Sequence, residues 1–190
     1  MEGARKSPDG GEPPGRPDES EALLVVRQIG RVPREPWRIA TRCQWGRPSV
    51  IASPSRLADG TPFPSLYWLT CPWLVESVGA LESAGLIAEW NERTDADPHL
   101  TEQLQATDAA FRALRARESG GEDACAAVGV AGQSNSARVK CLHAHVALTL
   151  AGIPDSVGEE TLALVGTSCE DDACASIAGV VTGTLPEDGV

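Results

Sequence analysis

Prolines and glycines divide this chain of 190 residues into a first part with short extended segments and a second part with helical patterns. In the first part, a link containing a glycine and a proline joins the runs 37–43 and 49–52, which predicts a hairpin. Asp59-Gly60 is a turn signal, and two later prolines keep the chain extended up to a third strand over 66–70. The first part therefore predicts a small antiparallel sheet.

The second part begins at Pro72, a residue that suits the first turn of a helix. Apolar residues at helical spacing then predict helices over 72–84, 98–119 and about 139–150, each followed by a glycine. Near the N-terminus, the segment 23–29 fits a short helix or a strand. The fold class that follows is α+β, with the sheet in the N-terminal half packed against about three to four helices.

Both ends of the sequence differ in composition from its middle. Residues 1–20 are rich in proline, glycine and charge, so we expect a disordered N-terminal tail. Residues 167–190 contain the acidic run 170–172, several glycines and no aromatic ring, so we expect a mostly disordered acidic C-terminal tail. Residues 21–166 are then a single globular domain.

The net charge of −11 excludes a uniformly basic nucleic-acid-binding protein. No run approaches the roughly 20 apolar residues that a membrane span needs. The first 20 residues also lack the apolar segment of a secretory signal. We therefore expect a cytoplasmic protein without a membrane partner.

Charge is unevenly distributed along the chain. Residues 22–58 hold seven arginines and one acid, whereas residues 61–190 hold six basic and nineteen acidic residues. An arginine-rich segment of this kind could bind an acidic protein, polyphosphate or RNA. The simpler interpretation, which we favour, is that these arginines are solvated and pack against the acidic half of the same chain.

The six cysteines do not indicate a disulfide scaffold, because the chain is too long and no export signal is visible. Cys43 lies at the predicted hairpin turn, Cys71 at the end of the third strand and Cys141 at the start of the third helix. Ends of elements are where side chains converge on a metal ion. The remaining cysteines are given no role: Cys125, Cys169 and Cys174.

Cys141 has two histidines close by in the sequence. On a regular helix it shares a face with His145, whereas His143 is turned away by about 200°. Cys141 and His143 can converge only if Cys141 lies at the helix cap. A helix N-terminus and the neighbouring Lys140 both favour a thiolate, which makes Cys141 a candidate metal ligand or nucleophile. The alternative is a small buried thiol with His143 packed in the core.

Two stretches are distinctive together and in this order: residues 57–72, LADGTPFPSLYWLTCP, and residues 138–144, RVKCLHA. They resemble the bacterial family called domain of unknown function 501. The resemblance covers about residues 22–166, and it also includes Arg42-Cys43 and the run 155–158. The family has no established activity, so the resemblance implies no reaction.

The resemblance implies a ligand pattern of Cys43, Cys71 and Cys141, with His143 following. Relatives often have a further cysteine two residues after the first, where this chain has Trp45. The set implied here is therefore three cysteines with His143, which suits structural zinc, or three thiolates with an open position, which suits an iron–sulfur cluster or a catalytic metal. His145 is the substitute ligand.

Three hypotheses follow, in this order. The first is a small metal-binding domain, with zinc or an iron–sulfur cluster held by the implied set. The second is a metal-free thiol enzyme that uses Cys141 as nucleophile and His145 or His143 as base. The third is an interaction module that binds an acidic partner through residues 22–58. The sequence assigns no reaction to any of them.

Overall fold

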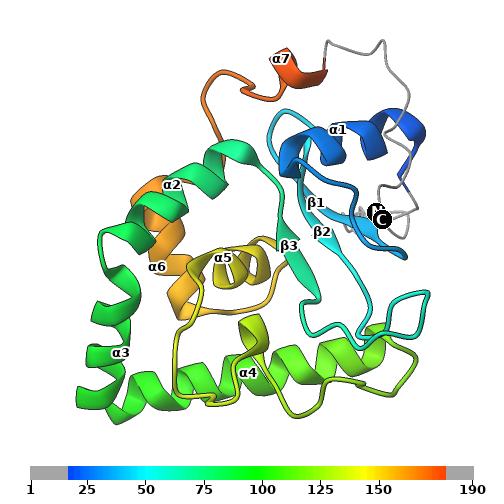
Figure 1. The fold of residues 1–190 in the computed structure, drawn as a ribbon. Coiled ribbons are helices and arrows are strands. Elements are labelled where there is room, and N and C mark those ends of the chain that lie inside the picture. The colour runs from blue at the N-terminus through cyan, green and yellow to red at the C-terminus, as the bar shows by residue number, and fades with distance from the viewer. Residues whose placement is uncertain (1–16, 179–190) are drawn as a thin grey trace, which may run out of the picture.

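The computed structural model describes residues 17–178, which form a three-stranded antiparallel sheet and seven α-helices (Figure 1). The strands are β1 (Arg38–Arg42), β2 (Pro48–Ala52) and β3 (Tyr67–Leu69), and they pair in the order β1-β2-β3. The helices are α1 (Glu19–Ile29), α2 (Pro72–Ser83), α3 (Leu86–Ala96), α4 (Pro98–Glu118), α5 (Leu142–Leu150), α6 (Ser156–Val165) and α7 (Ala175–Ala178), with a short 3₁₀ helix over Val130–Gly132. The predicted α+β class with an N-terminal antiparallel sheet is confirmed.

The described helices outnumber the three to four that the sequence predicts. α3 was not predicted because Gly85 is a natural stop for α2. Gly85 has a φ of 98°, and the chain turns at this residue directly into α3. α6 was not predicted because its apolar stripe is short. The Asp155 side chain caps it by accepting the backbone N–H of Val157.

Residues 23–29, for which the sequence allows a helix or a strand, belong to the helix α1, which begins with a capping box. The Asp18 side chain accepts the backbone N–H of Glu21, and the Glu21 side chain accepts that of Asp18. Gly30, in the left-handed conformation at φ 71°, ends the helix. A cap of this kind stabilises a helix by about 1 kcal/mol, and α1 forms.

The sheet buries both of its faces because its apolar residues alternate. Ile39 and Ile51 form one cluster with Val25 of α1. Val50 and Leu69 belong to the larger core on the other face, which is built mainly from the helices. The sheet is therefore a middle layer between α1 and the helical half.

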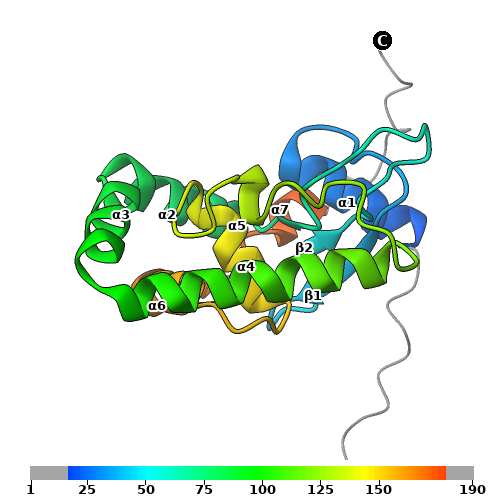
Figure 2. The same ribbon diagram turned by 90° about the horizontal axis from the view of Figure 1, so that it is seen from below.

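Helix α5 lies at the centre of the helical half, between β3 on one side and α2 and α6 on the other (Figure 1). Leu142, Val146 and Leu148 are buried, so α5 is covered nearly all round. The long helix α4 runs along one side of the molecule beneath it (Figure 2). The start of α5 therefore lies where the sheet and the helices meet.

Residues 167–178 follow α6, and α7 packs beside α1 (Figure 1). A guanidinium nitrogen of Arg27 donates to the carbonyl of Ile177 at 2.8 Å. This segment is the first part of the tail that composition predicts to be mostly disordered, and residues 179–190 lie outside the described residues. The same is true of residues 1–16 of the predicted N-terminal tail. Within residues 17–178, no helix is long and apolar enough to cross a membrane.

Candidate metal centre

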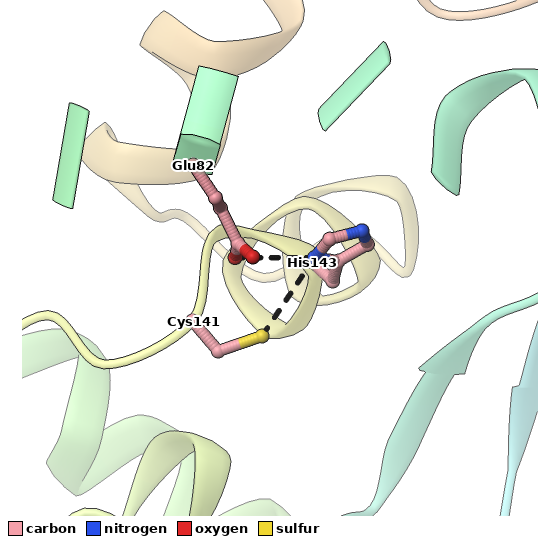
Figure 3. A group of neighbouring side chains, drawn as sticks. All are labelled: Glu82, Cys141 and His143. Atoms are coloured by element: carbon pink, nitrogen blue, oxygen red, sulfur yellow. Dashed lines mark hydrogen bonds and ion pairs between the residues drawn. The ribbon is translucent and has the colours of Figure 1, made fainter. Parts of the chain in front are cut away.

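The N-terminus of α5 brings Cys141 and His143 together (Figure 3). The helix begins at Leu142, three residues later than predicted, and Cys141 is its N-cap with extended backbone (φ −153°, ψ 117°). Because Cys141 lies outside the helix, its Sγ comes within 3.9 Å of Nδ1 of His143. This is the cap geometry that the spacing of the two residues requires.

Glu82, in the last turn of α2, completes the group (Figure 3). Its Oε1 lies 3.1 Å from Nδ1 of His143 and accepts the backbone N–H of Leu142 at 2.7 Å. The carboxylate therefore satisfies a free N–H at the start of α5, where a negative charge is favoured. Sequence analysis did not identify Glu82, because the contact joins two helices and leaves no local signal.

The ring of His143 is fixed by α2. Its Nε2 lies 3.0 Å from the carbonyl oxygen of Val75 and, because a carbonyl only accepts, Nε2 carries a proton. Gly79, one turn along, lies beside the ring: a Cβ there would be 4.0 Å from its nearest ring atoms, which is an ordinary contact. Nδ1 is thus the nitrogen that faces Cys141 and Glu82.

In the metal-free protein, Nδ1 holds a proton over an unusually wide pH range. The hydrogen bond with Cys141 raises the pKa of His143 to about 9, with further contributions from the Val75 carbonyl and Glu82. Partial burial acts in the opposite direction. A cation at Nδ1 is therefore favoured, whether it is a proton or a metal ion.

The spacing of the three donor atoms suits a metal ion. All three lie within 4.8 Å of one another. Ordinary zinc bond lengths and a tetrahedral angle place sulfur and nitrogen ligands about 3.6 Å apart, and nitrogen and oxygen ligands about 3.4 Å apart. The distances here are 3.9 Å and 3.1 Å, so small side-chain shifts would bring all three atoms to bonding distance.

Cys141 and His143 lie on the wall of a cavity of about 480 Å³ between α1, β3 and α5. The lining also includes Arg31 and Arg34, and it includes no aspartate or glutamate among the described residues. The aromatic rings of Phe63 and Trp68 stack in the lining at 5.7 Å between centroids. A cavity of this size and lining suits a small ligand with a negative charge.

The other predicted ligands lie elsewhere. Cys43 is at the β1–β2 turn and Cys71 is the buried N-cap of α2, and neither belongs to the group around Nδ1 of His143. His145 lies on the buried side of α5, with Nδ1 2.6 Å from Oδ2 of Asp155. Of the predicted set, the group thus contains only Cys141 and His143.

Several arginines of the 22–58 segment pair with acidic residues of the same chain. The pairs are Arg38 with Glu118, Arg42 with Glu21, and Arg47 with Asp172. Arg31 and Arg34 form no ion pair with a described residue, although Arg31 lies 5.1 Å over the ring of Trp68. The backbone N–H of Thr61 lowers the pKa of Asp59 and the nearby charge of Arg34 lowers it further, so Arg34 has an acidic neighbour even without a close ion pair.

Both distinctive sequence stretches contribute to this cavity, residues 57–72 through β3 and residues 138–144 through the start of α5. Fold and site define an α+β protein with a Glu/Cys/His group that could hold a metal ion beside a cavity of about 480 Å³. The chain belongs to the family described as protein of unknown function (DUF501), whose sequence profile matches residues 39–163, more than half of the chain. Searches of curated proteins and of solved structures found no match.

Proposed function

We propose that this protein binds a zinc ion through Glu82, Cys141 and His143 and uses it to act on a small anionic molecule in the adjoining cavity. The observation that carries the proposal is that three different donor atoms lie within 4.8 Å of one another, with the His143 ring held by the carbonyl of Val75. A metal-bound histidine usually donates its other N–H to a carbonyl or carboxylate in this way.

The donor set favours zinc over an iron–sulfur cluster. A thiolate, an imidazole and a carboxylate are all ordinary zinc ligands, whereas iron–sulfur clusters are held mainly by several thiolates. Cys141 is the single thiol of the group. Three protein ligands leave the fourth position of tetrahedral zinc open, which is the arrangement of catalytic rather than structural zinc sites.

The surroundings indicate what the open position would do. When bound, zinc lowers the pKa of a coordinated water and so supplies a nucleophile at neutral pH. Arg31 and Arg34 would hold the negative group of the substrate, and the Phe63–Trp68 stack would limit its size. We therefore propose hydrolysis as the class of reaction: water would cleave the phosphate ester bond of a small phosphate compound, or an ester or amide bond in a small molecule that carries a carboxylate.

Zinc titration of the metal-free full chain tests the proposal. We expect Cys141→Ser and His143→Gln to weaken zinc binding at this site by more than about 100-fold, since each removes a ligand. Glu82→Gln should weaken it less, because an amide oxygen is a poorer ligand. Cys125→Ser and His99→Gln, which alter a thiol and an imidazole outside the group, are the controls. Equal affinity in Cys141→Ser and the wild type would refute the proposal.

Metal-free thiol chemistry is the second candidate, favoured by the position of Cys141 at the N-terminus of α5 in the cavity wall. We rank it second because Glu82 and Cys141 share the same ring nitrogen of His143. In a catalytic triad, the acid and the nucleophile lie at opposite nitrogens. Iodoacetamide that labels Cys141 of the metal-free chain no faster than Cys125 at about pH 6 would exclude it.

A further inference from the structure

Strand β3 lies at an edge of the sheet, and the cavity follows that edge. The strand order is β1-β2-β3, and no other strand in the described part of the chain pairs with the outer side of β3. Tyr67 and Leu69 of β3 line the cavity, as does His143 in the first turn of α5. Helix α5 packs against β3 (Figure 1). The free edge and the candidate metal centre therefore share one cavity.

The register of the sheet shows which backbone groups of β3 point to the free edge. Two backbone hydrogen bonds flank the paired region, from Thr70 to Ser49 at 2.9 Å and from Ser53 to Leu66 at 2.8 Å. Hydrogen-bonded and non-bonded pairs alternate along an antiparallel ladder, so Trp68 is the bonded partner of Ile51. The N–H and C=O groups of Tyr67 and Leu69 then point away from β2.

These outward groups are without a partner among residues 17–178. No hydrogen bond joins the outward N–H or C=O of Tyr67 or Leu69 to another described residue. Leu69 is only 8% exposed, so water reaches its backbone poorly. Backbone groups in such surroundings normally have a partner. An extended peptide supplies alternating N–H and C=O groups and pairs with a free strand edge in this way.

The same cavity suits a carboxylate and an apolar side chain. The guanidinium of Arg31 lies 5.1 Å over the ring of Trp68, the middle residue of β3. Ser53, which is 4% exposed, also lines the cavity, and its hydroxyl is not bonded to any described residue. A guanidinium and a hydroxyl are both ordinary donors to a carboxylate. Much of the remaining lining is apolar, including Ile51 and Val75.

Resting on the function proposed above, we infer that the substrate is a short peptide with a free C-terminal carboxylate, which lies along β3 and pairs with Tyr67 and Leu69. The two residues are about 7 Å apart along the strand, the length of a dipeptide unit. The carboxylate lies toward Arg31, and an amide bond faces the metal centre. In the reaction, water adds to the carbonyl carbon of that amide and the C–N bond breaks. The departing nitrogen takes a proton from the water, which leaves a carboxylic acid and an amine.

Amide hydrogen exchange of the metal-free full chain, followed by NMR, tests the pairing directly. The probe is N-acetyl-leucyl-alanine with a free carboxylate, at saturation. We expect it to slow exchange of the Tyr67 and Leu69 N–H groups by about tenfold or more. Exchange at Trp68 should not change, because its N–H already pairs with β2. Unchanged exchange at Tyr67 and Leu69, or a peptide that does not bind, overturns the inference.

Matched ligands separate peptide recognition from attraction of any apolar acid. The same peptide with both amide nitrogens methylated should bind about tenfold more weakly, because two N–H donors are lost. Octanoate, an apolar carboxylate without amides, should also bind more weakly. Equal affinity of either ligand and the parent peptide overturns the inference.

The carboxylate contact has its own control. Arg31→Gln should weaken binding of the free carboxylate form by about tenfold and leave binding of the C-terminally amidated peptide unchanged. Equal effects on both forms overturn the assigned orientation. A chain that binds the peptide along β3 but takes up no zinc would refute the proposed function and leave the peptide site intact.

Discussion

Nδ1 of His143 in α5 lies 3.1 Å from Oε1 of Glu82 in α2, and these two helices are far apart in the sequence. Because the other ring nitrogen donates to the Val75 carbonyl, Nδ1 must share either a proton or a metal ion with the carboxylate. Zinc and the proton therefore compete for one atom, and Cys141 stabilises either of them.

The first prediction concerns the titration of His143 in the metal-free chain. Its folded pKa of about 9 exceeds the ordinary value of 6.5, so its contribution to stability is complete below about 6.5 and is lost as pH rises through about 9. Denaturation of the metal-free chain across this range should show that loss, and His143→Gln should remove it. An NMR titration that places the pKa of His143 near 6.5 would contradict the prediction.

The second prediction separates the two histidines of α5. His145 and Asp155 are 3% and 1% exposed, so His145→Gln leaves a buried carboxylate without its partner. We expect a loss of about 3 kcal/mol in the free energy of unfolding. Zinc stoichiometry should not change, whereas His143→Gln should reduce it. Loss of zinc in a folded His145→Gln protein would assign His145 to a metal site.

The third prediction concerns Arg115 of α4, whose side chain is fully buried. Its guanidinium pairs with Asp123 and donates to three backbone carbonyl oxygens, of Pro64, Cys125 and Val128. Arg115→Leu should cost about 3–5 kcal/mol, because Asp123 and these carbonyls lose their partner. Arg117→Leu, an exposed change on the same helix, should cost less than about 0.5 kcal/mol. Equal denaturation midpoints of the two variants would contradict this prediction.

The fourth prediction tests the close packing of α5 on α6. A Cβ at Gly158 would lie 2.4 Å from the carbonyl oxygen of His145 and 2.1 Å from Oγ1 of Thr149. The backbone carbonyl of His145 cannot rotate away as a flexible side chain can. Gly158→Ala should therefore push α5 and α6 apart and lower the free energy of unfolding by about 1–3 kcal/mol or more. Gly79→Ala adds the same methyl group to α2 at 4.0 Å from its nearest neighbours and should be neutral or stabilising. A Gly158→Ala protein as stable as the wild type would show that the helices can separate freely.

The fifth prediction concerns the cavity. Arg31→Gln and Arg34→Gln each remove a positive charge from the lining of the cavity that Cys141 and His143 share, so each should weaken binding of inorganic phosphate by about tenfold. Arg56→Gln, from the same arginine-rich segment but outside the cavity lining, is the matched control. Isothermal titration at two salt concentrations measures the effect. Equal weakening by all three variants would indicate a general charge effect rather than a site.

The fold was largely predictable where proline and glycine mark element ends. The hairpin, the third strand and α2 follow from such local signals, and β1, β2 and β3 lie within one or two residues of the predicted strands. α3 was not predictable in this way, because its buried face depends on Trp90 packing into the core rather than on a clear stripe. Tertiary contacts decide such a segment.

The site was predictable in part for a similar reason. The spacing of Cys141 and His143 predicts that the two side chains can meet only if Cys141 is the helix cap, and Cys141 is the N-cap of α5. Glu82 reaches the site only through the packing of α2 on α5.

The zinc content of the full chain, purified without oxygen and without added metal, tests the central claim most directly. The Glu82, Cys141 and His143 site predicts zinc in a colourless protein, with one equivalent lost in Cys141→Ser and none lost in Cys125→Ser. Equal zinc in the wild type and Cys141→Ser, or a folded wild-type chain that carries iron or no metal, would contradict it.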